Sequence, residues 1–394
     1  MTAITQAPTL IAPVRGREEL AAVTRELAIT APAYDRSGEL PWSGIEAAQH
    51  AGLLTATVGR RYGGAETGPV ETARILIALG EGDPSVALLA ANTLAVHQAQ
   101  AVRPHWPEEL YLDLLALGSQ RPALVNAIRA EPDLGAPARG GLPATTATWT
   151  SDGWLISGRK AYATGGSGLA YHVVWVRVVE PNGDPERPRV GHALVAADLP
   201  GISWIETWDH LGLRASNTHD VVYDQVLVPH DALVEIPRDP DGVYRDPAAA
   251  PGIASFGHPA LYIGVARAAR SAFVAFARER VPSALGRPIA QTERIAAVAG
   301  EIDAQLAQAE TLLFGALLRA EAGDTDHLAR LPLIKVQIAR SVIAAVNAAV
   351  AALGNPALSR HQPFERHLRD VLAIRVHPPQ EDAALLAAGR RLLD

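Results

Sequence analysis

The sequence of 394 residues contains no cysteine. This absence removes disulfide bonds, thiolate metal ligands and thiol nucleophiles, and it is compatible with the reducing cytoplasm. Thirteen histidines remain available. Three of them, His361, His367 and His377, lie close in sequence, but their spacing does not place all three on one helix face and no acidic partner completes a ligand set. We therefore expect no metal site.

The chain also lacks a concentration of basic residues. Its formal net charge is -7, which argues against nucleic acid or an anionic membrane as the main partner, because phosphate binding draws on a basic surface. Residues 1–11 lack the basic start and apolar run of a signal peptide, and no segment approaches the roughly 20 continuous apolar residues of a membrane span. We expect a cytoplasmic protein whose partner is a small molecule.

The pattern of apolar residues changes twice along the chain. With 48% hydrophobic and 20% charged residues, the composition is that of a globular protein with two or three packed units. Helical spacing predicts an N-terminal helical domain over 1–121, and short β-branched runs between turn residues predict a β domain over 122–237. A linker rich in Pro and Asp over 238–251 precedes renewed helical periodicity, which predicts an antiparallel bundle over 252–394.

The stretch 152–164 combines a hairpin signal with polar groups at a strand end. Asp152-Gly153 lies between the alternating segment 146–150 and the apolar run 154–156, which predicts a tight primed turn between two strands. The second strand ends in Ala163-Thr164-Gly165-Gly166, where two glycines let a flat ligand approach the backbone and a hydroxyl can face it. These groups suit the edge of a flavin ring. The following Gly-Ser-Gly is not a phosphate loop, because no Lys-Ser/Thr follows it.

Together with four further segments, this stretch resembles the acyl-CoA dehydrogenase superfamily across essentially the whole chain. The other segments are Arg61-Tyr62-Gly63-Gly64, Glu131-Pro132, Leu211 to Thr218 with the strand 221–229, and Glu365 to Asp370. The resemblance implies an α+β fold with an N-terminal helical domain, a middle β-barrel and a C-terminal four-helix bundle. It also implies a flavin cofactor, FMN or FAD, and a homotetramer.

The catalytic base of the common dehydrogenases is missing. Those enzymes need a carboxylate to remove the weakly acidic α-proton. Where the resemblance places this Glu, the chain has Pro378, and the alternative position on the first bundle helix, within 254–258, holds no carboxylate. Glu381 and Asp382 lie nearby, but a shift of several residues moves a helical side chain through most of a turn. Either one remains open as a substitute base.

His377 instead matches a histidine of the flavin-dependent monooxygenase branch of the superfamily. That branch uses reduced flavin and O₂, and an imidazole titrating near neutrality suits hydrogen bonding beside the reacting oxygen. His377 could otherwise simply pack between helices. In the same branch Asn126 would lie near the flavin face and His97 would line the pocket; a turn-forming Asn and a packed His are the alternatives.

The resemblance also assigns residues to cofactor binding. These are Tyr162, Ala163, Thr164, Trp208, Arg214, Ser216 and Arg369, although Trp208 could equally belong to the barrel core. The segments that hold the adenosine half of FAD in the dehydrogenases are eroded at 281–286 and 351–355. Glu293 stands where a Gln is expected, and its charge would repel a pyrophosphate. FMN, or a loosely held flavin, therefore becomes plausible.

The leading hypothesis is a monooxygenase acting on a small organic substrate and fed reduced flavin by a separate reductase, with His377 as the main polar catalyst. The first alternative is an acyl-CoA dehydrogenase with an unusual base such as Glu381. The second is a flavin-binding homologue without turnover.

Overall fold

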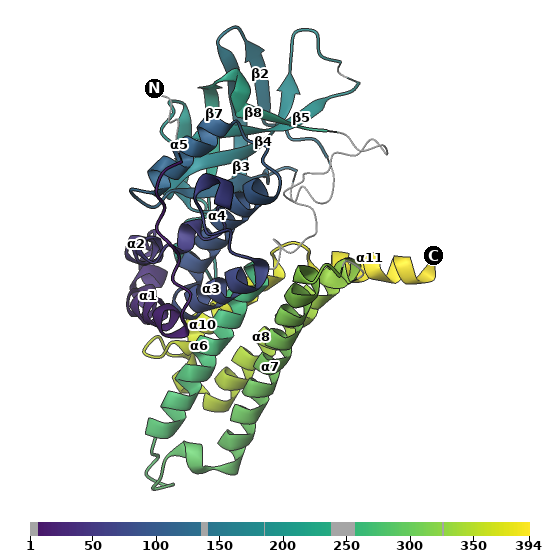
Figure 1. Ribbon diagram of the computed structural model, residues 1–394. Helices are drawn as coiled ribbons and strands as arrows, with labels where there is room; N and C mark the ends of the chain where they lie inside the picture. Colours follow the sequence, from purple (N-terminus) through teal and green to yellow (C-terminus); the bar gives the residue numbers. More distant parts are fainter. Residues whose placement is uncertain (1–6, 135–140, 185, 238–256, 325–326) are drawn as a thin grey trace.

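The computed structural model describes residues 7–134, 141–184, 186–237, 257–324 and 327–394. Helices come first, strands follow and helices return, so the predicted order is confirmed (Figure 1). The predicted linker 238–251 and most of the segment 254–258 lie outside the described residues.

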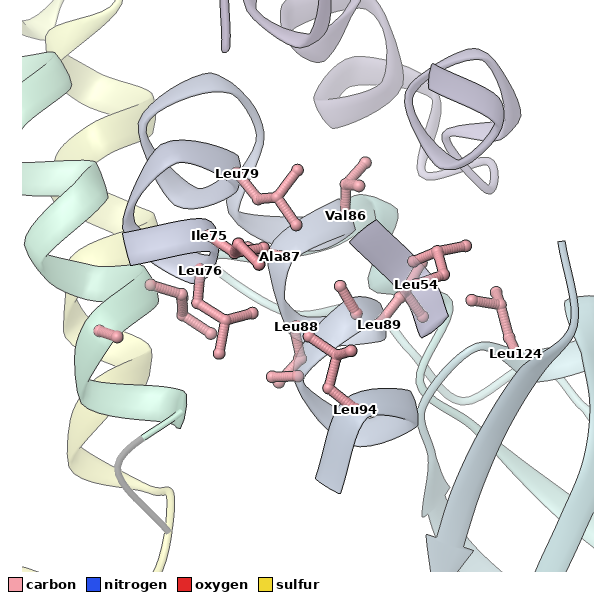
Figure 2. Close-up of a cluster of buried hydrophobic side chains, with 14 of the residues drawn as sticks. Leu54, Ile75, Leu76, Leu79, Val86, Ala87, Leu88, Leu89, Leu94 and Leu124 are labelled. Atoms are coloured by element: carbon pink, nitrogen blue, oxygen red, sulfur yellow. The ribbon is translucent and has the colours of Figure 1, made fainter. Parts of the chain in front are cut away.

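Five α-helices lie within the described residues 7–121, and α4 is at their centre. Asp83 ends α3 and begins α4, because its carboxylate accepts from the backbone N–H groups of Ser85 at 2.8 Å and Val86 at 3.4 Å. Leucines of α3 and α4 pack together and reach Leu124 of the first strand (Figure 2). The five helices are α1 (Arg17–Ser37), α2 (Trp42–His50), α3 (Pro69–Gly82), α4 (Pro84–Val102) and α5 (Glu108–Gly118).

The middle part is one eight-stranded sheet. Its order is β6-β7-β3-β2-β4-β5-β8, with β1 paired to β4. Among the described strands, β6 and β8 at the two ends of this order are not paired with each other. The strands are β1 (Leu124–Ile128), β2 (Thr146–Thr150), β3 (Gly153–Ala163), β4 (Leu169–Val179), β5 (Arg189–Ala196), β6 (Ile202–Ile205), β7 (His219–Val228) and β8 (Leu233–Ile236).

The predicted hairpin is present, but its turn lies one residue earlier than expected. Thr150 pairs with Gly153, so Ser151 and Asp152 form the two-residue turn and Gly153 opens β3. Gly153 has φ +148°, and a Cβ there would lie 2.2 Å from the carbonyl oxygen of Val228 on β7. Glycine is needed at this position because β7 passes too close for a side chain.

The C-terminal part is a bundle of α6, α7, α8 and α10, which confirms the four-helix prediction (Figure 1). Two of its helices, Gly257–Glu279 and the stretch Leu328–Leu353, have the length and composition to cross a membrane, but 56% and 50% of their apolar windows are buried inside the protein. Such burial is typical of core helices. The helices are α6 (Gly257–Glu279), α7 (Glu293–Glu321), α8 (Leu331–Leu353), α9 (Asn355–Leu358), α10 (Phe364–Leu372) and α11 (Glu381–Leu393).

The N-terminal helices and the bundle meet where α3 crosses α6. A Cβ on Gly80 of α3 would lie 2.2 Å from the carbonyl oxygen of Leu261, and a Cβ on Gly264 of α6 would lie 2.3 Å from that of Ile77. Since each glycine faces the backbone of the other helix, the two helices approach more closely than side chains would allow.

We predict that Gly80→Ala destabilises the protein by about 1–3 kcal/mol, because the added methyl overpacks a backbone contact. Urea unfolding measures the change. The matched control is Gly300→Ala on α7, where nothing lies within 4 Å of the new Cβ, so the better helix propensity of Ala should stabilise by up to about 1 kcal/mol. Equal effects of the two substitutions would contradict the close crossing.

Candidate functional site

A chain of three buried hydroxyls lies at the end of β3. Thr218 donates to Thr164 at 3.2 Å, and the hydroxyls of Ser216 and Thr218 are 2.7 Å apart. Because the proton of Thr218 is used on Thr164, Ser216 must donate to Thr218. Thr164 then accepts within the chain, and its own proton is left to donate outward. The chain therefore presents one directed hydroxyl at the strand end.

Backbone bonds from two other elements hold the same strand end. The side-chain amide of Asn126 on β1 donates to the carbonyl of Thr164 at 3.2 Å. The N–H of Gly165, which has φ +102°, donates to the carbonyl of Ser216 at 3.0 Å. Ala163, buried on the strand itself, completes the predicted segment. The structure thus brings Asn126, Thr164 and Ser216 together at the end of β3. Their contact with a flavin stays a prediction.

The short helix η5 (Arg214–Ser216), which carries Ser216, lies between two residues in left-handed backbone conformation. Leu213 has φ +53° and Asn217 has φ +50°, values that cost free energy for residues other than Gly. Two bonds from outside hold Leu213 in place. Its N–H donates to Asp370 Oδ1 at 2.7 Å, and its carbonyl accepts from the indole N–H of Trp208 at 3.0 Å.

Three of the predicted cofactor residues are engaged in other contacts or stand at the surface. Arg369 binds both carboxylate oxygens of Asp35, at 2.9 and 2.6 Å, and also Glu365. Arg214 donates to the carbonyl of Asp35 at 2.8 Å. Tyr162 has φ +58° and is 61% exposed. Contact of these three side chains with a cofactor stays a prediction.

Trp208 packs against the hydrophobic core from this loop. It is half-buried and stacks on His210, with ring centroids 3.8 Å apart and planes 9° apart. Its backbone N–H donates to His219 Nδ1 at 3.1 Å. Both contacts fix the ring within the loop that precedes η5.

His377 belongs to a cluster of rings between α6 and the turn before α11. Its centroid lies 4.6 Å from that of His258 and 5.7 Å from that of Tyr262, and its Nδ1 is 3.5 Å from the Tyr262 hydroxyl. His258 and Tyr262 are four residues apart on α6, so both face the same side. His258 and Tyr262 were not predicted; their spacing on a helix is the only sequence signal that pairs them.

Desolvation keeps these imidazoles neutral, although both side chains are only half-buried by exposed area. It lowers the pKa of His258 to about 4, with Lys335 adding to the shift. Burial, His258 and Lys335 together lower the pKa of His377 well below its usual value. The expectation of an imidazole titrating near neutrality is therefore wrong. At neutral pH His377 can donate or accept a hydrogen bond, but it does not carry a positive charge.

No described carboxylate is among the groups that shift the pKa of His258 or His377, although the carboxylate of Asp370 on α10 acts on Tyr262. The charged group that shifts the pKa of both histidines is the Lys335 ammonium. Glu381, weighed as a substitute base, lies on α11 and accepts from Arg340 at 3.0 Å in an exposed ion pair. The described residues therefore offer two neutral histidines and a tyrosine where a dehydrogenase needs a base.

His97 lies elsewhere on α4, in an aromatic contact with α5. It is 2% exposed, and its Nδ1 is 3.0 Å from the hydroxyl of Tyr111. Burial lowers its pKa to about 4. Its described contacts are those of a packed, neutral histidine, and its predicted place in the pocket stays a prediction.

A small apolar cavity adjoins the start of α6, one residue before His258. Its walls come from α3, α4, α6 and α7, and its polar groups are those of Thr72 and Gln98. The lining residues are Pro69, Thr72, Ala73, Leu76, Ala91, Leu94, Ala95, Gln98, Gly257 and Leu317. No charged side chain lines it, so it suits an uncharged group.

Three family models match the chain in the order of its three parts. They describe the N-terminal, middle and C-terminal domains of acyl-CoA dehydrogenases and match residues 17–103, 127–226 and 256–379. The chain is 30% identical to the putative acyl-CoA dehydrogenase YdbM of Bacillus subtilis over 93% of this chain and 94% of that protein. The chain therefore belongs to the acyl-CoA dehydrogenase family.

Within the family, the similarity extends to enzymes of other chemistry. The chain is 29% identical to L-evernosamine nitrososynthase of Micromonospora sp. over 90% of this chain and 84% of that enzyme. The crystal structure of KijD3 in complex with FMN and a dTDP-amino sugar has a TM-score of 0.78 and 25% identity, covering 98% of this chain and 96% of that one.

Four histidines with lowered pKa values predict how stability depends on pH. Burial lowers the pKa of His97, His172 and His258 to about 4 and that of His367 to about 3, whereas an unfolded His titrates near 6.5. Between these values the unfolded chain binds protons that the folded chain does not. The free energy of unfolding should therefore fall as pH falls from about 6.5 to 4.

Urea unfolding at several pH values between 7.5 and 4.5 tests this, with the slope giving the number of protons taken up. His172→Phe should reduce that number by about one. Buried Asp370, whose pKa is raised to about 7, takes up a proton in the folded state over the same range and opposes this trend. An unchanged proton uptake in His172→Phe would therefore be the result that shows this imidazole is not held neutral.

Proposed function

We propose that the protein is a flavin-dependent monooxygenase that uses reduced flavin and O₂ to oxidise a small organic substrate. The observation that carries the proposal is the pair of neutral imidazoles, His377 and His258, beside Tyr262, with no described carboxylate among the groups that shift the pKa of either histidine. Removal of an α-proton needs a strong, positioned base. An oxygen-transfer reaction needs hydrogen-bond donors in a site closed to water.

The residues at the end of β3 fit a flavin. The outward hydroxyl of Thr164 can donate to a ring-edge nitrogen or carbonyl. The positive φ values of Gly165 and Gly166 give the tight turn that follows it, packed closely against Leu169 and Asn217. Bound there, flavin would supply the electrons that activate O₂. Ser216 and Thr218 orient Thr164, and Asn126 holds its carbonyl.

His377 would act as a hydrogen-bond donor to the reacting oxygen. The Tyr262 hydroxyl stays protonated, because burial raises its pKa well above the usual value. It can donate to Nδ1 of His377, which leaves the ring proton on Nε2. A neutral Nε2–H orients oxygen without releasing a proton to it.

The proposal includes FMN as the flavin, a separate reductase that supplies it in reduced form, and assembly into a homotetramer. Glu293, exposed in the first turn of α7, adds negative charge where the family's FAD enzymes bind a pyrophosphate, which favours FMN. The FMN-bound relative KijD3 supports this choice. A separate reductase would deliver reduced flavin to a cytoplasmic homotetramer.

We predict that His377→Ala retains flavin affinity but releases H₂O₂ instead of product, because the oxygen loses its donor. The ratio of product to flavin oxidised should fall about a hundredfold. Reduced FMN is mixed with O₂ and a panel of aromatic and thioether compounds, and H₂O₂ and product are both measured. Unchanged coupling would remove His377 from the mechanism.

Glu381→Gln separates the proposal from its main rival. A monooxygenase should keep its coupling in this variant, because Glu381 pairs with Arg340 at the surface. In a dehydrogenase with Glu381 as base, an acyl-CoA would bleach the oxidised flavin of the native protein, and the substitution would abolish the bleaching. Flavin binding without either activity would favour the homologue without turnover.

A further inference from the structure

The chain uses lysine in two places only. Of its 35 basic residues, Lys160 and Lys335 are the lysines, and the others are arginines. Lys160 is fully buried and Lys335 is 5% exposed. Burying an ammonium group is costly unless its donors are satisfied. Each lysine therefore has to do something that an arginine does not.

The two buried ammonium groups have different partners. Lys160 Nζ donates to the carboxylate of Glu131 at 2.7 Å and lies over the ring of Trp175, so it is half of a buried ion pair. Lys335 on α8 has no carboxylate in hydrogen-bond distance among the described residues. All its described bonds go to backbone oxygens.

Lys335 gathers the carbonyls of the turn that carries His377. Its Nζ donates to the carbonyl oxygens of Ile374 at 2.8 Å, His377 at 2.9 Å and Pro379 at 3.1 Å. An ammonium has three N–H donors, so the three bonds use all of them. A guanidinium is planar and longer, and its forked donors would not meet three converging carbonyls in the same way.

The sequence of the turn explains why it needs this partner. Carbonyls at the end of a helical segment are normally bound by N–H groups that follow them. Pro378 and Pro379 have no N–H, so the backbone after η10 (Ala373–Arg375) has few donors to offer. Lys335 supplies the missing donors from a different helix.

We propose that Lys335 is the positioning residue for His377. It fixes the backbone of residues 374–379, and the His377 ring is thereby held against His258 and Tyr262 of α6. This inference rests on the proposed role of His377. Lys335 touches neither substrate nor cofactor in the proposal; it acts only through the turn.

The positive charge of Lys335 supports the same role as its hydrogen bonds, because it favours the neutral form of His377. The groups that face His377 are His258 and Tyr262 from α6 and Lys335 from α8. Behind them, Asp370 of α10 acts on Tyr262, and Glu381 of α11 acts on Lys335. The ammonium lies close enough to lower the pKa of both histidines. Without it, the imidazoles would bind protons more readily.

The test compares Lys335→Met with Arg340→Met. Methionine keeps the length and apolar stem of the lysine but has no N–H donor. The control removes a cation from the same helix that pairs with exposed Glu381 and not with the turn. Lys335→Gln, which retains two donors, serves if the methionine variant does not fold.

Two readouts are needed, and the first requires no turnover. In protein labelled with ring ¹⁵N-histidine, and with His377 assigned by the His377→Ala spectrum, the native protein should show one neutral tautomer protonated at Nε2. Lys335→Met should show exchange between tautomers and a higher imidazole pKa. The second readout is the ratio of product to flavin oxidised, which should fall about tenfold or more while flavin affinity stays similar. Arg340→Met should match the native protein in both.

The outcomes separate this inference from the function on which it rests. If the native protein forms no oxygenated product but Lys335→Met still alters the His377 signals, the monooxygenase proposal fails and the positioning by Lys335 stands. Native signals and coupling in Lys335→Met would overturn the inference. So would a loss of coupling that Arg340→Met reproduces, since that would reflect stability alone.

Discussion

The consecutive pair Arg369 and Asp370 on α10 ties the three parts of the molecule together. Arg369 holds Asp35 of α1 with a bidentate ion pair and donates to the carbonyl of Leu211 at 2.9 Å. Asp370 accepts from Leu213. Gly212 lies between these contacts, and a Cβ there would be 2.3 Å from the Arg369 carbonyl. The left-handed loop before η5 is therefore pressed onto α10, and the position of Ser216 depends on that contact.

The proposed site has two sides, and buried donors fix each of them from a distance. On the β side, Thr218 fixes the direction of the Thr164 hydroxyl. On the helical side, Lys335 fixes the turn of His377. In both cases a residue that would contact the ligand, Thr164 or His377, is oriented by a residue that would not contact it, Thr218 or Lys335. Such support is what keeps catalytic geometry within a fraction of an ångström, since a site left to side-chain freedom alone loses its orientation.

The sequence predicted the element types well because their signals are local. The hairpin before Thr164, the change of periodicity near residues 121 and 237, and the family motifs all lie within short windows. The turn of the hairpin shifted by one residue because the passage of β7 beside Gly153 is a tertiary constraint. The neutrality of His377 was missed for the same reason: burial and the charge of Lys335 come from other helices. His258 and Lys335 could not be paired with His377 without the fold, although the scarcity of lysine marked Lys335 as unusual.

The protonation states of His377 and Tyr262 restrict the possible reactions more than the sequence motifs do. A histidine with a strongly lowered pKa is neutral at pH 7 and is a weaker base than an ordinary imidazole, so His377 is poorly suited to remove an α-proton. It can still orient an oxygen through a neutral N–H, and Tyr262 supports that role because it remains protonated. The positive charge of Lys335 lowers the basicity of the two imidazoles further. It thereby favours a neutral imidazole that acts as a hydrogen-bond donor. Lys335 therefore makes sense in a site for oxygen transfer and would be a disadvantage in one for proton abstraction by His377.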